Sequence, residues 1–60
     1  MNKQDWQINI ENLMASVAEK IGPEAAKAPL IRVGATCFED LSPCYYDAVF
    51  GDLMQMDSDP

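Results

Sequence analysis

The segment DWQINIENLMASVAEKIGP, residues 5–23, decides the fold because its apolar side chains recur with the period of an α-helix. Asn2 or Asp5 can cap the start of this helix, and Gly22 with Pro23 supplies a stop signal. We therefore expect an amphipathic helix that begins between Asn2 and Asp5 and ends before Gly22. Its apolar stripe, at steps of four, three, four and four residues, consists of Trp6, Ile10, Leu13, Val17 and Ile21, widened by Met14 and Ala18.

A second helical segment begins at Pro23, which suits the first turn of a helix because its missing N–H needs no partner there. Glu24 favours the positive end of the same helix, and the alanines that follow have high helix propensity. Pro29 removes a backbone hydrogen bond inside the segment. We therefore expect either two short turns or one bent helix before Gly34.

Two start signals precede the last helix. The sequence TCFE at residues 36–39 matches a capping box and predicts a single turn over residues 37–41. Ser42 and Pro43 then place a capping hydroxyl before a proline, which predicts that the last helix begins at Pro43. We expect it to end at Met54 or Met56, with the apolar positions Tyr46, Val49, Phe50 and Leu53.

No segment shows the alternation of a strand, so the sequence predicts an all-α fold, a compact bundle of three to four short helices. We expect one domain over residues 1–56, followed by a polar tail over residues 57–60. A chain of this size hides only roughly 60% of the surface that it exposes when unfolded. Small domains gain stability from a disulfide, a metal ion or self-association.

The first two of these sources are disfavoured by the sequence. The chain contains no histidine, and two cysteines alone do not make a zinc site. No secretory signal precedes Cys37 and Cys44, so we expect buried thiols rather than a disulfide. Self-association, in the form of a homodimer, is then the expected compensation.

The net charge of −6 comes entirely from residues 35–60, which contain six acidic and no basic side chains. Acidic surfaces repel nucleic acid and anionic lipid and attract cations, so we expect a basic protein partner, without direct contact to nucleic acid or membrane. No apolar run has the length of a bilayer span, which predicts a soluble, cytoplasmic protein.

The expected contact residues lie near and within the last helix. Asp40, Asp47 and Asp52 would steer and pair with the partner, and Tyr45 would be buried against it. Adjacent residues of a helix point about 100° apart, so Tyr45 is expected to be exposed where Tyr46 is buried. The side chains expected to anchor the core or a self-association interface are Trp6, Tyr46 and Phe50.

Catalytic and metal chemistry is not indicated by any motif. Glu39 and Asp40 are adjacent carboxylates, but the start of a helical turn is a favourable place for acids in any protein. Cys37 lacks a histidine base, and the aspartates after residue 51 lack the spacing of a calcium loop. We therefore expect no enzyme activity, no metal site and no cofactor.

The residues VGATCFEDLSPCYYDAVFGDL, from Val33 to Leu53, resemble a segment of small uncharacterised helical proteins of phages and conjugative elements. The shared pattern, which lies within Gly34 to Leu53, is a helix that ends at glycine, a short turn before leucine, and a proline with an aromatic residue opening the last helix. The resemblance implies an accessory protein of a mobile element. One specific form is an anti-CRISPR-like inhibitor of a basic nucleic-acid-binding or defence protein.

The alternative from a different class is a small helical regulator associated with nucleic acid. Its phosphate contacts would depend on the four basic residues of the chain, which all lie before residue 35. These are Lys3, Lys20, Lys27 and Arg32.

Overall fold

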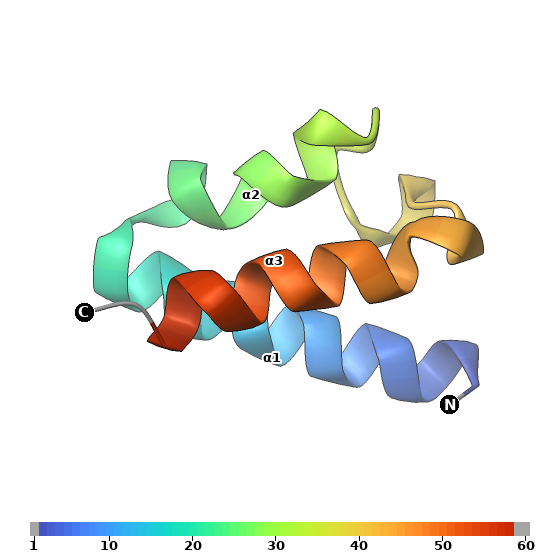
Figure 1. Ribbon diagram of the computed structural model, residues 1–60, viewed down its shortest axis with the longest axis horizontal. Coiled ribbons are helices and arrows are strands. Elements are labelled where there is room, and N and C mark those ends of the chain that lie inside the picture. Colours follow the sequence, from blue (N-terminus) through green and yellow to red (C-terminus); the bar gives the residue numbers. More distant parts are fainter. Residues whose placement is uncertain (1, 59–60) are drawn as a thin grey trace.

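Three α-helices and two short 3-10 turns make up the computed structural model, which describes residues 2–58 (Figure 1). The order along the chain is α1 (Lys3–Ile21), α2 (Pro23–Arg32), η1 (Phe38–Asp40), η2 (Pro43–Tyr45) and α3 (Tyr46–Ser58). No strand occurs within residues 2–58. The expected all-α bundle of three to four short helices is confirmed.

Helix α1 lies against both of the other helices, whereas α2 and α3 share much less contact with each other. Figure 1 shows α1 and α3 running side by side in the same direction. Helix α2, which comes between them in the sequence, runs in the opposite direction. The two 3-10 turns are part of the connection that returns the chain to the starting end of α1.

The ends of α1 form as their residue types predict. The Asn2 side chain accepts a hydrogen bond from the backbone N–H of Asp5 at 2.8 Å, which satisfies a free donor of the first turn. At the other end Gly22 adopts a φ of 110°, and its N–H donates to the carbonyl of Ala18 at 2.9 Å. This left-handed conformation favours glycine and lets α2 start directly at Pro23.

Helix α2 is one continuous helix, so the alternative of two short turns is wrong. The Pro29 ring is fully buried, and this burial of apolar surface offsets part of the cost of the backbone hydrogen bond that proline cannot donate. Gly34 follows the helix with a φ of 83°, as its position after the last turn suggests.

The expected capping box at residues 36–39 does not form. The Thr36 hydroxyl donates to the Asp40 carboxylate at 2.7 Å, and the residue that precedes η1 is Cys37, without a side-chain cap. Ser42 also makes no capping hydrogen bond before η2. The last helix was expected to begin at Pro43. Instead, Pro43–Tyr45 form the single 3-10 turn η2, and regular α-helix begins only at Tyr46.

The buried core draws on all three helices, on η1 and on the residues on either side of η1. Within residues 2–58 its apolar side chains are Ile10, Val17, Ala26, Leu30, Ala35, Phe38, Leu41, Tyr46, Val49 and Leu53. Ile21 was expected to extend the stripe of α1 but is 57% exposed, because it is the last residue before the turn at Gly22. The middle of the stripe is confirmed by the complete burial of Ile10 and Val17.

An aromatic cluster closes the end of the bundle at which α1 and α3 begin. Trp6 lies 5.9 Å from Tyr46 and 5.7 Å from Phe50 between ring centroids, and Phe38 stacks on Tyr46 at 5.0 Å. Such pairs contribute about 0.5–1.5 kcal/mol each beyond the area that they bury. The three expected anchors Trp6, Tyr46 and Phe50 therefore meet inside one chain.

Two expectations about the C-terminal half are wrong. Cys37 and Cys44 are free thiols, as expected, but both are exposed rather than buried, because they lie in the turns around η1 and η2 and not on a core-facing helix position. Helix α3 continues to Ser58, beyond the end expected at Met54 or Met56, and Asp57 binds α1. Residues 59–60 of the expected tail lie outside the described residues.

Gly51 lies on the exposed side of α3, and a Cβ atom built on it meets no other atom within 4 Å. We predict that Gly51→Ala raises the free energy of unfolding by about 0.5–1 kcal/mol, since alanine loses less backbone entropy on folding. Urea unfolding of both proteins measures this difference. As a control, Gly34→Ala should destabilise by roughly 1 kcal/mol because its φ is positive; an equal effect of both substitutions would contradict the assignment.

Candidate functional site

The acidic side chains expected to bind a partner occupy three different settings. Asp40 lies in η1 and accepts the hydrogen bond of Thr36. Asp47 lies in the first turn of α3, where it is exposed and makes no hydrogen bond or ion pair with any described residue. Asp52 lies farther along α3, and its Oδ2 is 3.2 Å from Nη1 of Arg32 on α2.

The Arg32–Asp52 ion pair bridges α2 and α3 at the surface. The side chains of Arg32 and Asp52 are 68% and 39% exposed. An ion pair with this exposure contributes between about 0 and 1 kcal/mol, because water and salt screen it. Both groups can therefore exchange this contact for another at small cost.

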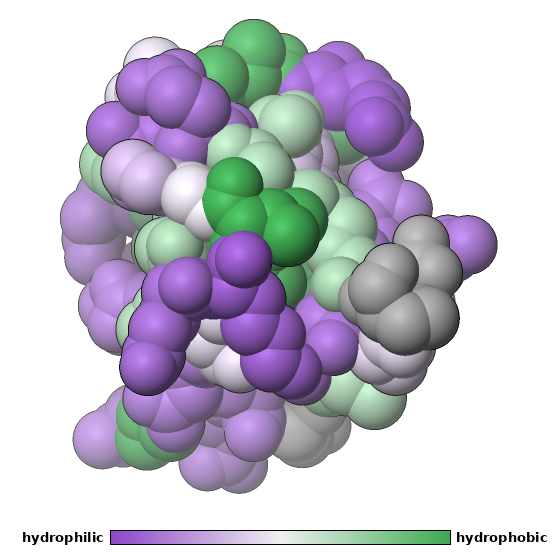
Figure 2. Space-filling model, turned by 90° about the vertical axis from the view of Figure 1, so that its left-hand side faces the viewer, coloured by the Kyte–Doolittle hydropathy of each residue, from purple (hydrophilic) through white to green (hydrophobic). Residues whose placement is uncertain are grey.

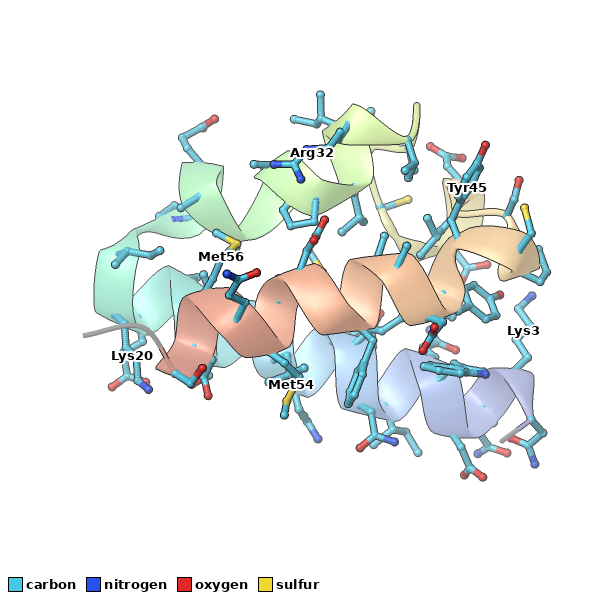
Figure 3. All side chains as sticks on the ribbon, in the orientation of Figure 1. Lys3, Lys20, Arg32, Tyr45, Met54 and Met56 are labelled. Carbon is cyan, nitrogen blue, oxygen red and sulfur yellow. The ribbon has the colours of Figure 1, made fainter. Side chains whose placement is uncertain are left out.

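The four expected contact residues do not share one face. Asp47 and Asp52 are five residues apart, which places them about 140° from each other around the axis of α3. Tyr45 is 41% exposed, and Figure 3 shows its side chain on the α2 side of α3. Tyr45 and Asp52 thus point toward the same side, away from Asp47, and Asp40 extends from a separate turn. The expected exposure of Tyr45 and burial of Tyr46 are confirmed.

A groove lies between α2 and α3 on the side of Asp52. It has a volume of about 180 Å³ and is lined by Arg32, Asp52, Gln55 and Met56. Met56 points into the space between α2 and α3, whereas Met54 points toward α1 and is 48% exposed (Figure 3). We name the groove between α2 and α3 the α2–α3 groove. Sequence reasoning missed it, although the four-residue step from Asp52 to Met56 places the two on one side of a helix.

A second cleft lies where α1, α2 and the residues before η1 meet. Its volume is about 280 Å³, and its surface is mostly apolar. The residues that line it are Glu11, Met14, Lys27, Thr36, Cys37 and Phe38. Cys37 is the exposed thiol at this cleft, and Lys27 makes no ion pair with the described residues.

A hydrogen-bonded cluster around Asp57 fastens the end of α3 to α1. The Ser16 hydroxyl donates to Asp57 Oδ1 at 2.5 Å, and Lys20 Nζ lies 3.1 Å from the same oxygen. Lys20 also donates to the Asp57 carbonyl at 2.9 Å, so it satisfies a free acceptor in the last turn of α3. These hydrogen bonds from Ser16 and Lys20 hold the pKa of Asp57 below its ordinary value. Sequence reasoning missed this cluster because it assigned Asp57 to a tail.

The exposed apolar residues on the face in Figure 2 do not form one continuous surface of strong hydrophobicity. The most hydrophobic areas are separated by weakly hydrophobic and polar atoms. Over the described residues the exposed isoleucines are Ile8, Ile21 and Ile31, at 50%, 57% and 58%. Such scattered side chains are common on folded proteins.

Two other kinds of site are not found within residues 2–58. No group of three or more histidine, cysteine or acidic side chains is arranged to hold a metal ion. Within the same residues, no helix combines the length and apolar character of a membrane span.

Comparisons of the chain with protein-family models, with curated proteins and with solved structures gave no significant match.

We predict that Asp57→Asn destabilises the protein at neutral pH and that the effect disappears in acid. Because the folded protein lowers the pKa of Asp57, its carboxylate stabilises the fold above the ordinary value of 3.8, and this contribution is lost as the pH falls through the lower folded value. Thermal unfolding of both proteins between neutral and acidic pH measures the difference. In a Ser16→Ala, Lys20→Gln background the difference should shrink at neutral pH, and a difference independent of pH would refute this role.

Proposed function

We propose that this chain is a non-catalytic interaction module that binds a basic surface of a protein partner through the acidic side chains of its C-terminal half. One observation carries the proposal: the C-terminal half has exposed carboxylates that form no ion pair with a basic side chain of the described residues. These carboxylates are those of Glu39, Asp40 and Asp47, which are exposed and form no ion pair with any described residue.

Two of the four basic side chains form ion pairs, and the other two, Lys3 and Lys27, form none with the described residues. Lys20 pairs with Asp57 and Arg32 pairs with Asp52. Lys3 and Lys27 belong to α1 and α2. The resulting negative field would accelerate association with a cationic protein and oppose approach to a phosphate backbone.

The resemblance of residues 33–53 to proteins of phages and conjugative elements supports a more specific form of the proposal. In this form the protein acts in the cytoplasm of a bacterial host and inhibits a basic nucleic-acid-binding or defence protein, as anti-CRISPR proteins do. Its carboxylates would occupy a groove that normally holds phosphates. Self-association would double the number of carboxylates available, since residues 35–60 contain six.

The test is affinity capture from a host lysate with the wild type and with an Asp40→Asn, Asp47→Asn, Asp52→Asn variant, at low and at physiological salt. We expect the wild type alone to retain a basic protein, because the variant loses three of the charges that attract it. The captured protein is then purified and its binding to both forms is measured directly.

A control variant with the same net charge distinguishes binding at a defined site from attraction by the overall charge of the protein. Asp5→Asn, Glu19→Gln, Glu24→Gln removes three exposed acids from α1 and α2. This variant should retain the partner. Loss of binding in both variants would show a dependence on net charge alone, and retained binding to DNA at physiological salt would favour the nucleic-acid regulator instead.

We also propose that the chain forms a homodimer, in which the half-buried faces of Trp6 and Phe50 would lose their remaining exposure. A dimer that is more stable than its subunits melts at a higher temperature when the protein is concentrated. The melting temperature should therefore rise over a hundredfold range of concentration. An unchanged melting temperature, together with a monomeric mass in sedimentation, would reject self-association.

A further inference from the structure

The side of the bundle on which α1 and α3 meet keeps three apolar side chains partly open to solvent. Trp6 of α1 and Phe50 of α3 lie 5.7 Å apart there between ring centroids, and both are only half-buried. Met54 follows Phe50 by four residues, which places it on the same side of α3. It is 48% exposed and points toward α1 (Figure 3). We name Trp6, Phe50 and Met54 the α1–α3 strip.

Two charged residues of opposite sign flank the strip at the end where α1 and α3 begin. Lys3 precedes Trp6 by three residues on α1, and Asp47 precedes Phe50 by three residues on α3, so each charge lies beside its aromatic neighbour. Both charged side chains are exposed, and neither forms an ion pair with the described residues. The strip therefore has a free base on one helix and a free acid on the other.

The far end of the two helices repeats this distribution of charge. Lys20 of α1 lies 3.1 Å from Asp57 of α3, and their side chains are 54% and 28% exposed. Because this pair lies at the surface, its groups can also interact with charges of a neighbouring molecule. Where the two helices meet, α1 thus carries a base at each end and α3 carries an acid at each end.

This arrangement of charge is complementary to itself under one two-fold rotation. In a symmetric dimer the same patch of both copies forms the interface. Helices α1 and α3 run in the same direction (Figure 1), so a two-fold axis parallel to them places α1 of each copy on α3 of the other, start against start. Lys3 then approaches Asp47 of the second copy, and Lys20 approaches the second copy's Asp57.

The alternative two-fold axis is disfavoured by the same charges. An axis that crosses the helices at a right angle places α1 on α1 of the second copy in opposite directions. Lys3 then approaches Lys20 of the second copy, and the acids of α3 approach each other in the same way. Since like charges repel across an interface, the axis parallel to the helices is the favoured one.

Resting on the self-association proposed above, we propose that the α1–α3 strip is the interface of a homodimer whose two-fold axis runs parallel to α1 and α3. Lys3 of each copy pairs with Asp47 of the other copy. Trp6 of each copy packs against Phe50 of the other, and Met54 is buried beside them. The dimer adds buried apolar surface, which a chain of this size lacks on its own.

A second copy suits this strip better than the basic partner does. The strip is flanked by two bases and two acids, so its charge is balanced and a cationic surface gains little there. A second copy meets each of these charges with one of the opposite sign. In the dimer Asp47 is engaged by the second copy, and Asp40 and Asp52 remain for the basic partner.

The experiment measures the dissociation constant of the dimer of the full chain by sedimentation equilibrium at low salt. Lys3→Glu and Asp47→Lys should each raise this constant about fivefold, because each substitution brings like charges together at two symmetric places. The double variant should return close to the wild-type value, since the pair re-forms with its signs exchanged. Lys27→Glu and Glu24→Lys make the same changes of charge on α2 and should alter the constant less than about twofold.

The apolar part of the interface is tested with Met54→Ala, which should raise the dissociation constant about fivefold. Its matched control is Ile8→Ala, because Ile8 is 50% exposed and lies about 160° from Trp6 around the axis of α1. This control should change the constant less than about twofold. Circular dichroism of each variant establishes that the helices are intact before dissociation constants are compared.

The outcomes distinguish this interface from self-association in general. A tighter dimer of the Lys3→Glu variant would indicate the perpendicular axis and overturn the inference. Equal effects of Met54→Ala and Ile8→Ala, or of Lys3→Glu and Lys27→Glu, would also overturn it and leave a homodimer with another interface. A wild type that stays monomeric at every concentration would reject both this interface and the homodimer, and would leave the binding of a basic partner standing.

Discussion

The contact of α1 with both other helices is the interaction on which the rest of this structure depends. Ile10 and Val17 are completely buried, and they share one core with Leu30 of α2 and Leu53 of α3. Because α2 and α3 contact each other less, their relative placement follows from the surface of α1 that each of them covers. The groove between α2 and α3 lies along this looser contact.

Both ends of this arrangement are fastened by contacts between α1 and α3, but by different chemistry. At the start of the two helices, Trp6 packs against Tyr46 and Phe50. At their end, Ser16 and Lys20 bind Asp57. The aromatic end depends on burial and is insensitive to salt, whereas the polar end depends on an ionised carboxylate that water partly screens. Between α2 and α3, the polar side-chain contact found among residues 2–58 is the exposed Arg32–Asp52 pair.

Charge and packing are thus distributed separately in this small protein. The apolar core is drawn from the whole chain, while the excess of carboxylates lies in the half that contains η1, η2 and α3. Two of these carboxylates are engaged in fastening the helices, and others, such as Asp47, remain directed to solvent. The carboxylates that face solvent, such as Asp47, are therefore not among the contacts that hold the helices together.

The sequence by itself determined the three helices, the ends of α1 and the burial of Tyr46 beside an exposed Tyr45, because caps, glycines and apolar spacing act over a few neighbouring residues. Only the tertiary structure decided which polar residues meet. The pairs of Ser16 and Lys20 with Asp57, and of Arg32 with Asp52, join positions 20 to 41 residues apart in sequence. It also decided that Pro29 is tolerated within one helix and that Cys37 and Cys44 face solvent. Such outcomes depend on how the helices are placed against one another, which local propensity does not encode.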